Sequence, residues 1–254
     1  MDINILLAWQ NFRNGPGACL ESLMLKMSFL GEMNTVLIFI ALIYWCVSKN
    51  FGNYLLMGWN GGRVVNGFLK VTACVYRPWI RDARIVPSAE ALPTATGYSF
   101  PSGHSTNAGA LYGGGAIRRE LSKALRITLG IIAVLIALSR NYLGVHTPQD
   151  ILVGLGSGLL VMWLTAKLIA WIEKNPTDVT MVTRITRLAT GLLSYYAVSL
   201  ILASLLKGWI PGVGGSIVSS FIQMFYISFI FPWLIKHFER VREYRSGRAD
   251  HGMV

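Results

Sequence analysis

The chain has 254 residues, of which 53% are hydrophobic and 14% are charged, and its mean hydropathy of +0.49 is high for a water-soluble domain. The net charge of +11 is spread over short loops between apolar runs, which excludes a nucleic-acid-binding face and is typical of membrane topology. We therefore expect an all-α, polytopic transmembrane bundle that forms a single domain over residues 1–254, with the lipid bilayer as its partner.

The three cysteines do not indicate a disulfide framework or a zinc site. Cys19, Cys46 and Cys74 contain no CxxC pair, and their number is odd. The sequence leaves a bridge between Cys19 and Cys74 open, and it leaves the oligomeric state open as well.

The first 32 residues are expected to form an interfacial segment. They lack the basic start, apolar core and small-residue cleavage site of a signal peptide, so we interpret them as retained. Leu6, Leu7, Trp9 and Phe12 lie among polar neighbours, as in a short amphipathic helix on a membrane surface. A frayed terminus is the alternative.

Apolar runs along the rest of the chain are each predicted to form a helix. About 20 apolar residues cross the hydrocarbon core as a helix, so we expect about six to seven spans. The third run is weakly hydrophobic and rich in Gly and Ala, and it should pack inside the bundle, where small residues let helices approach closely. The runs cover Met33–Ser48, Phe51–Leu69, Gly103–Ile117, Ile127–Leu143, Ile151–Ile172, Leu188–Leu206 and Ser216–Ile235.

Most basic residues gather on one side of these spans, which we assign to the cytoplasm because short, positively charged loops stay there. That side includes the tail at residues 236–254. The opposite side holds the N-terminal segment, the turn Arg140–Pro148 and the loop Val71–Pro101, which is long enough to suggest a function. Its basic residues depart from the topology rule, and binding an anion would explain them: Lys70, Arg77, Arg81, Arg84 and Arg140.

A histidine and a carboxylate are four residues apart where the run Ile151–Ile172 begins. His146 and Asp150 can share one face of a helix start, so the carboxylate could hold one imidazole nitrogen and leave the other free as a nucleophile. On its own, the HxxxD pattern fits a structural histidine equally well.

A second histidine follows a helix start in the sequence Pro101-Ser102-Gly103-His104. Backbone N–H groups at a helix N-terminus favour an anion, and Gly103 lets the backbone approach a phosphate closely. His104 would then be placed to give a proton to a leaving alkoxide. Alone, this segment could be a turn and a helix cap.

Three cations complete the pattern, because phosphoryl transfer depends mainly on positioning and on neutralising charge. Lys70, Arg77 and Arg140 could surround the phosphate oxygens, and the planar fork of arginine suits two oxygens at once. Contact with lipid headgroups is the alternative for any one of them.

Together these residues resemble a known family signature. The pattern KxxxxxxRP, PSGH and SRxxxxxHxxxD is similar to that of the type 2 phosphatidic acid phosphatase (PAP2) superfamily, and all eleven fixed positions from Lys70 to Asp150 match. The resemblance implies a catalytic core at residues 66–172 in a membrane lipid phosphate phosphatase. It implies His146 as nucleophile, Asp150 as its partner and His104 as acid. It also implies a reaction without metal or cofactor, with phosphate ligands at Lys70, Arg77, Ser102, Gly103 and Arg140.

Three arginines outside the signature are candidate substrate contacts. Arg63 precedes Lys70 by two helical turns, so it could extend the polar site or pair structurally. Arg81 and Arg84 could attract anionic headgroups or belong to a solvated loop beside Asp82.

The resemblance implies a lipid phosphate or diphosphate as substrate, of the phosphatidic acid, phosphatidylglycerophosphate or polyprenyl diphosphate type. A small soluble ester, as in glucose-6-phosphatase, and a non-catalytic lipid transporter are the alternatives. A bacterial plasma membrane is the expected location, with the active site on the extracytoplasmic face and the C-terminus in the cytoplasm.

Overall fold

The computed structural model describes residues 2–174, apart from the side chains of residues 172 and 173. This part of the chain is mostly helical and contains no strand. The chain divides into two units, and Met1–Ile169 form the first. Its helices are α1 (Asp2–Asn14), α2 (Glu21–Leu30), α3 (Met33–Leu42), α4 (Lys49–Ala73), α5 (Pro78–Arg81), α6 (Gly103–Ala108), α7 (Gly114–Ala116), α8 (Lys123–Tyr142) and α9 (Pro148–Lys174), the last of which continues past the unit's end.

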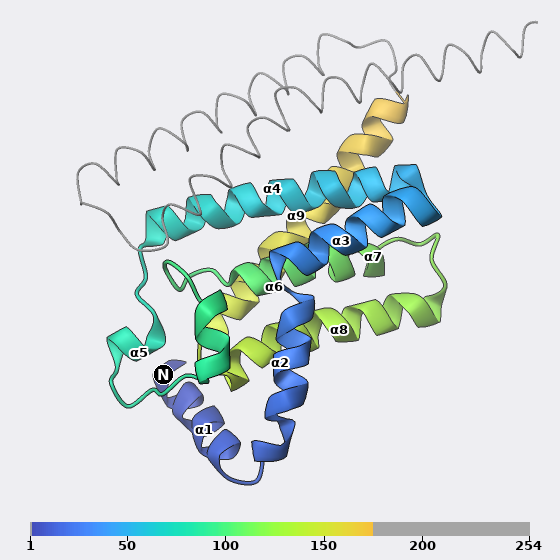
Figure 1. Ribbon diagram of the computed structural model, residues 1–254. Coiled ribbons are helices and arrows are strands. Elements are labelled where there is room, and N and C mark those ends of the chain that lie inside the picture. Colours follow the sequence, from blue (N-terminus) through green and yellow to red (C-terminus); the bar gives the residue numbers. More distant parts are fainter. Residues whose placement is uncertain (1, 175–254) are drawn as a thin grey trace, which may run out of the picture. The chain divides into compact units, whose positions relative to one another are not determined.

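The long helices run back and forth between two ends of a bundle (Figure 1). α4 and α8 run in one direction, and α3, α6 and α9 run in the other, so the end of α4, the start of α6 and the end of α8 lie near one another. Apolar side chains from these helices fill the space between them, among them Val36, Ile40, Tyr54, Leu55, Trp59, Ala108, Leu111, Ile136 and Met162. The bundle thus gathers the three signature segments at one end.

The Gly- and Ala-rich run lies inside the bundle, as its composition predicts. It forms α6, a π-turn at Gly109–Gly113 and α7, and its residues 104–115 are all buried. A Cβ atom added to Gly109 would lie 2.5 Å from the Leu155 carbonyl oxygen, and one added to Gly158 would lie 2.5 Å from the Thr106 carbonyl oxygen. Backbone therefore meets backbone where this run crosses α9, and only glycine fits at the crossing.

Two helices in the described part of the chain are long and apolar enough to cross a membrane, at Lys123–Tyr142 and Pro148–Trp171. Ala18–Leu30 and Met33–Val47 add a third crossing if they form one span with a bend of 59°. α4 extends the predicted run at both ends but carries buried polar side chains, so hydropathy alone does not mark it as a span. The total of six to seven stays a prediction, since runs 188–206 and 216–235 lie outside the described residues.

The first 32 residues form two ordered helices, so the frayed terminus is wrong. α1 buries Leu6, and its Arg13 donates hydrogen bonds to the carbonyl oxygens of Val86 at 2.5 Å and Tyr142 at 3.3 Å. This end of the chain is therefore anchored to the protein itself. The sequence pattern does not predict α2, because polar residues interrupt its apolar run. Cys19, Cys46 and Cys74 are free thiols.

Candidate active site

Helix ends and the loops that follow them carry the signature residues. Lys70 lies in the last turn of α4, which ends at Cys74, whose left-handed backbone (φ 49°) turns the chain towards Arg77. Arg140 lies in the last turn of α8, His146 in the turn between α8 and α9, and His104 in the first turn of α6. The bundle thus brings together residues that are up to 80 positions apart, from Lys70 to Asp150.

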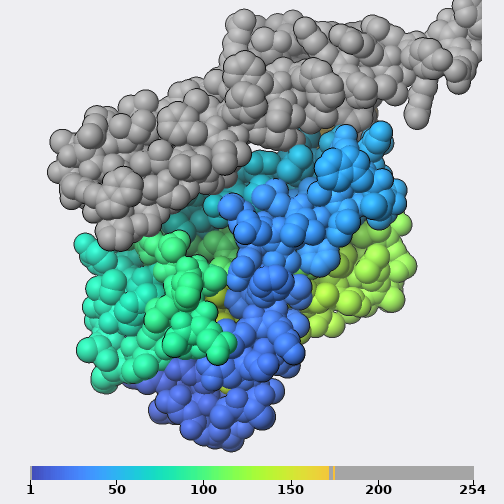
Figure 2. Space-filling model, in the orientation of Figure 1, coloured from blue at the N-terminus to red at the C-terminus, as the bar shows by residue number. Residues whose placement is uncertain are grey.

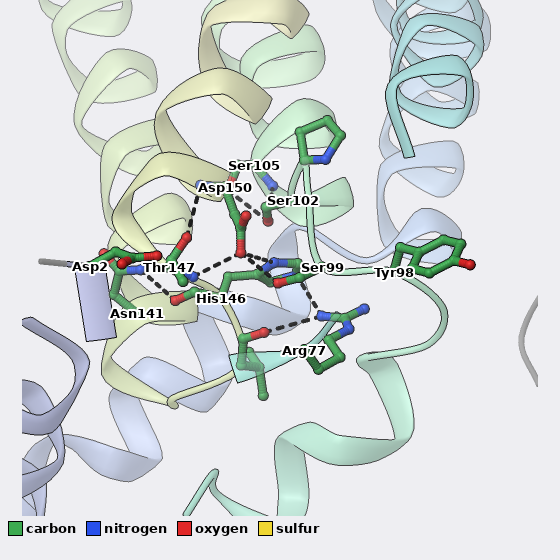
Figure 3. A network of polar contacts seen from close by, with 12 residues as sticks. Asp2, Arg77, Tyr98, Ser99, Ser102, Ser105, Asn141, His146, Thr147 and Asp150 are labelled. Atoms are coloured by element: carbon green, nitrogen blue, oxygen red, sulfur yellow. Dashed lines mark hydrogen bonds and ion pairs between the residues drawn. The ribbon is translucent and has the colours of Figure 1, made fainter. Parts of the chain in front are cut away.

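His146 and Asp150 form the pair that their spacing predicts. The imidazole Nδ1 lies 3.3 Å from Asp150 Oδ2, and both side chains are almost completely buried. The same carboxylate oxygen accepts hydrogen bonds from the Thr147 backbone N–H at 2.8 Å and from Ser99 Oγ at 2.6 Å. Figure 3 shows these contacts converging on Asp150. The carboxylate is therefore fixed by the backbone and by a side chain as well as by the histidine.

The other nitrogen of His146 faces a cation. Arg77 Nη1 lies 3.0 Å from His146 Nε2 (Figure 3). A guanidinium can only donate, so Nε2 accepts, and the proton of the neutral ring is on Nδ1, from which it reaches Asp150. The nitrogen that carries the lone pair is thus Nε2, which accepts a hydrogen bond from Arg77.

The surroundings of His146 keep its imidazole neutral. His146 lies outside both candidate spans, and burial lowers its pKa well below the ordinary value of 6.5. The positive charges of Arg77, Arg140 and Lys70 lower this pKa further. A neutral imidazole is the form that a nucleophile requires.

One short stretch, the 94–99 segment, contacts every cation of the signature. Arg77 donates to the carbonyl oxygens of Gly97 at 2.9 Å and Thr96 at 2.5 Å, and Lys70 Nζ donates to that of Tyr98 at 2.5 Å. Arg140 donates to Thr94 Oγ1 at 3.3 Å and, on its other side, to Ser28 Oγ of α2 at 2.5 Å. These cations are thus held by neutral oxygen atoms.

The start of α6 differs in detail from the expected phosphate cradle. Ser102 Oγ accepts from the Ser105 N–H at 3.3 Å and caps the helix, but the Ser102 N–H donates to the Asp150 carbonyl oxygen at 2.9 Å. The Ser102 and Ser105 amides are therefore occupied, and an anion would meet the amides of Gly103 and His104. The Ser102–Asp150 bond also fixes the α6 start against the α9 start.

His104 and Arg140 each keep one buried polar atom for which the described residues supply no hydrogen-bond partner, Nε2 and Nε respectively. Buried polar groups are nearly always bonded in native proteins, so such atoms suggest that another group binds there. The charges of Arg140, Arg77 and Arg63 all act on His104, which places its imidazole within the same cluster.

The three additional arginines separate into two groups. Arg63 Nη1 lies 3.8 Å from the position that a Cβ on Gly103 would take, so this guanidinium borders the PSGH segment. Arg81 instead pairs with Asp2 at 3.2 Å, and Arg84 pairs with Asp82 at 2.7 Å, both at the surface. The structure therefore brings Arg63 to the cluster but not Arg81 or Arg84.

Sequence reasoning missed the 94–99 segment and Asn66. Asn66 Nδ2 donates to the Pro101 carbonyl oxygen at 3.3 Å and to Thr106 Oγ1 at 2.9 Å, which joins α4 to the PSGH segment. Its position between Arg63 and Lys70 on one helical face was a usable signal. The 94–99 segment acts largely through backbone carbonyl groups, which every residue type has, so no such signal exists there.

The cluster lies beneath the surface. Arg140, His146 and Asp150 are at most 2% exposed. In Figure 2, the loop before α6, coloured green, lies at the surface next to the N-terminal helices, in blue. The bonds of Arg140 to Thr94 and Ser28 join these two elements.

Comparison with known proteins matches this site to a described family. Residues 51–174 match the PAP2 superfamily. Phosphatidylglycerophosphatase B of Bacillus subtilis (strain 168) is 36% identical over 121 residues, which are 44% of this chain and 55% of that protein. Lipid A 1-phosphatase of Rhizobium johnstonii is 37% identical over 68 residues, 27% of each chain. The chain thus spans about half, or less, of the length of these relatives.

A solved structure agrees with the fold. The crystal structure of a transmembrane PAP2 type phosphatidylglycerolphosphate phosphatase from Bacillus subtilis has a TM-score of 0.54 and 29% sequence identity, and it covers 67% of this chain and 85% of that one. The matched residues 51–174 contain the whole cluster from Arg63 to Asp150. This part of the chain, residues 51–174, thus belongs to the PAP2 superfamily.

Proposed function

We propose that the protein is an integral-membrane phosphatase that hydrolyses a lipid phosphate through a phosphohistidine, without a metal ion. The observation that carries this proposal is the state of His146: its Nδ1 is held by Asp150, and its lone-pair nitrogen lies 3.0 Å from a cationic Arg77 nitrogen. A phosphate that binds Arg77 would therefore bring its phosphorus atom next to the nucleophile.

In the first step, the Nε2 lone pair of His146 attacks phosphorus, and the ester P–O bond breaks. The electron pair of that bond stays on the leaving oxygen, which takes a proton from His104. Lys70, Arg77 and Arg140 neutralise the equatorial oxygen atoms, where charge spreads in the transition state. Asp150 stabilises the positive charge that develops on the His146 ring.

In the second step, water attacks the phosphohistidine. His104, now neutral, accepts a proton from this water, the P–N bond breaks, and its electron pair returns to Nε2. Inorganic phosphate leaves and both histidines regain their first state. The cations around His104 oppose its protonation before the reaction, and the negative charge of a bound phosphate offsets them, so we expect substrate binding to support the proton on His104.

A lipid substrate is favoured by the membrane setting and by the relatives. Phosphatidylglycerophosphate leads among the candidates, because a relative and a solved structure similar to this chain are named for it. Phosphatidic acid and polyprenyl diphosphate carry a comparable headgroup. We further propose a bacterial plasma membrane as the location, with the cluster on the extracytoplasmic face and the C-terminus in the cytoplasm.

The decisive experiment is phosphate release by the purified protein in EDTA. The panel contains phosphatidylglycerophosphate, phosphatidic acid, a polyprenyl diphosphate, lipid A and glucose 6-phosphate. We expect hydrolysis of a lipid phosphate that EDTA leaves unchanged. A strong preference for glucose 6-phosphate would replace the lipid proposal, and loss of activity in EDTA would contradict the metal-free reaction.

His146→Ala should abolish turnover and the acid-labile phosphoenzyme, because the nucleophile is lost. His104→Ala should slow turnover by about 10²–10⁴-fold, the usual contribution of general acid–base catalysis. Arg84→Ala is the matched control, since it removes a basic residue whose partner is Asp82 at the surface. Substantial hydrolysis by His146→Ala would remove this residue as the nucleophile.

A further inference from the structure

Ser99 contacts the histidine–carboxylate pair although it lies outside the signature. Its side chain is completely buried, and its Oγ donates to Asp150 Oδ2 at 2.6 Å. This length is typical of a hydroxyl that donates to an ionised carboxylate, among the stronger hydrogen bonds in proteins. The Ser99 backbone also lies against the His146 imidazole (Figure 3). The serine therefore touches both members of the pair.

The backbone of Ser99 is fixed on both sides of the serine. Its N–H donates to the Val75 carbonyl oxygen at 2.8 Å, two residues before Arg77. The preceding residue, Tyr98, accepts the Lys70 ammonium through its carbonyl oxygen. The hydroxyl is thus part of the structure that places two cations of the site, and its direction is determined before any substrate arrives.

We propose that Ser99 is a positioning residue for His146, which acts by holding the Asp150 carboxylate in the orientation that directs the lone pair of Nε2 towards the phosphate. The proposal rests on the proposed function. Asp150 Oδ2 receives a bond from Ser99, from the Thr147 N–H and from His146 Nδ1. Of these three partners, Ser99 alone comes from a different chain segment, so it ties the carboxylate to the 94–99 segment, which contacts the cations.

Loss of the hydroxyl should have two consequences. The carboxylate loses its shortest bond and gains freedom to rotate, so the imidazole is less often in the reactive orientation. The carboxylate also keeps more of its negative charge for the imidazole, which favours the protonated ring. Charged and titratable groups that face His146 from the packed elements stay in place: Asp150 of α9, Arg77 before α5, Arg140 of α8, Lys70 of α4 and His104 of α6.

The test compares Ser99→Ala, Ser99→Thr and wild type by kcat/KM between pH 4 and 9 with short-chain phosphatidic acid in detergent micelles. We expect kcat/KM of Ser99→Ala to fall by about 10–100-fold, by analogy with the loss of a hydrogen-bond partner that orients a metal-ligating histidine. The acid limb of its pH profile should move to higher pH, because the nucleophile protonates more readily. Ser99→Thr keeps a hydroxyl and should restore most of the rate and the wild-type limb.

Ser88→Ala is the matched control. Ser88 is also buried, and its Oγ donates to the Glu21 carboxylate at 2.7 Å, away from the histidines. It should lose a comparable hydrogen bond without any movement of the acid limb. The phosphate group of the substrate titrates equally in every sample. A difference between variants in the position of the acid limb therefore comes from the protein.

An unchanged rate in Ser99→Ala, or a lower rate without movement of the acid limb, would overturn the proposal. If Ser99→Ala does not fold in gel filtration, Ser99→Cys takes its place, because a thiol is a weak donor and should move the limb in the same direction. His146→Ala, measured in parallel, separates the two ideas. An active His146→Ala contradicts the proposed function, whereas an inactive one with a wild-type Ser99→Ala contradicts only the role of Ser99.

Discussion

At the residue scale, the chemistry depends on which nitrogen of His146 carries the proton. The contact with Arg77 and the contact with Asp150 agree on this point, because the first can only offer protons and the second, when ionised, can only accept them. Burial and three nearby cations make His146 a weak base. Its imidazole therefore remains neutral over the pH range in which a phosphate is dianionic. The environment therefore favours a nucleophile.

The protonation state of His146 can be observed directly by NMR with ¹⁵N-labelled histidine. Because burial and the neighbouring cations lower its pKa well below 6.5, the ring should stay neutral at pH 6 with its proton on Nδ1. His146→Asn assigns the signal by removing it. A doubly protonated His146 at pH 6 would contradict this account of the site.

The lowered pKa of His146 also makes the free energy of unfolding depend on pH. The unfolded chain binds a proton near pH 6.5, whereas the folded chain does so only at lower pH. The contribution of His146 to the free energy of unfolding is therefore complete above pH 6.5 and decreases as the pH falls from there through its folded-state pKa.

At the element scale, the contact of the glycine-rich run with α9 determines the distance between the two catalytic segments. Gly158→Ala should separate these helices, because the added Cβ would lie 2.5 Å from the Thr106 carbonyl oxygen and 3.0 Å from the Ala110 nitrogen. Neither atom belongs to a flexible side chain. We expect a loss of about 1–3 kcal/mol in stability, the usual cost of overpacking, together with most of the activity.

Gly156→Ala is the control on the same helix. A Cβ there meets nothing within 4 Å, and alanine is favoured over glycine in a helix by about 1 kcal/mol. This variant should be as stable as wild type or more so. Thermal unfolding in detergent and phosphate release measure both changes, and equal behaviour of the two variants would show that the crossing does not position the site.

The pattern of apolar runs predicts α4, α8 and α9 well, because each is a long periodic helix whose burial is set by its neighbours. It fails at α2, where polar residues such as Ser28 face the site rather than solvent, and at the π-turn Gly109–Gly113, which hydropathy does not encode. In the site, the signature residues could be predicted because their side chains have the chemistry that phosphoryl transfer requires. Ser99 and the carbonyl groups of the 94–99 segment could not be found in this way, since tertiary contact alone makes them relevant.

At the scale of the whole molecule, the proposed orientation in the membrane requires an odd number of crossings between α1 and α8. Cys19 and Arg119 are both exposed, and α2–α3, α4 and the α6–α7 run lie between them. We therefore expect these two positions on opposite sides of the membrane, with Cys19 on the side of the active site.

Labelling with a membrane-impermeant maleimide in intact cells tests the orientation. Cys19 as the single cysteine, in a Cys46→Ser, Cys74→Ser background, should react before lysis. Arg119→Cys in a cysteine-free background should react only after permeabilisation. The reverse pattern would invert the proposed topology, and reaction of both in intact cells would mean that the intervening helices do not make three crossings.

The 94–99 segment concentrates the supports of the site in six consecutive residues. If the cations of a site were hydrogen-bonded to separate loops, mutations would remove these hydrogen bonds one at a time. Here a single deletion would put every later carbonyl group out of register with its cation and would carry the Ser99 hydroxyl away as well. A deletion in this stretch should therefore remove all of these contacts at once.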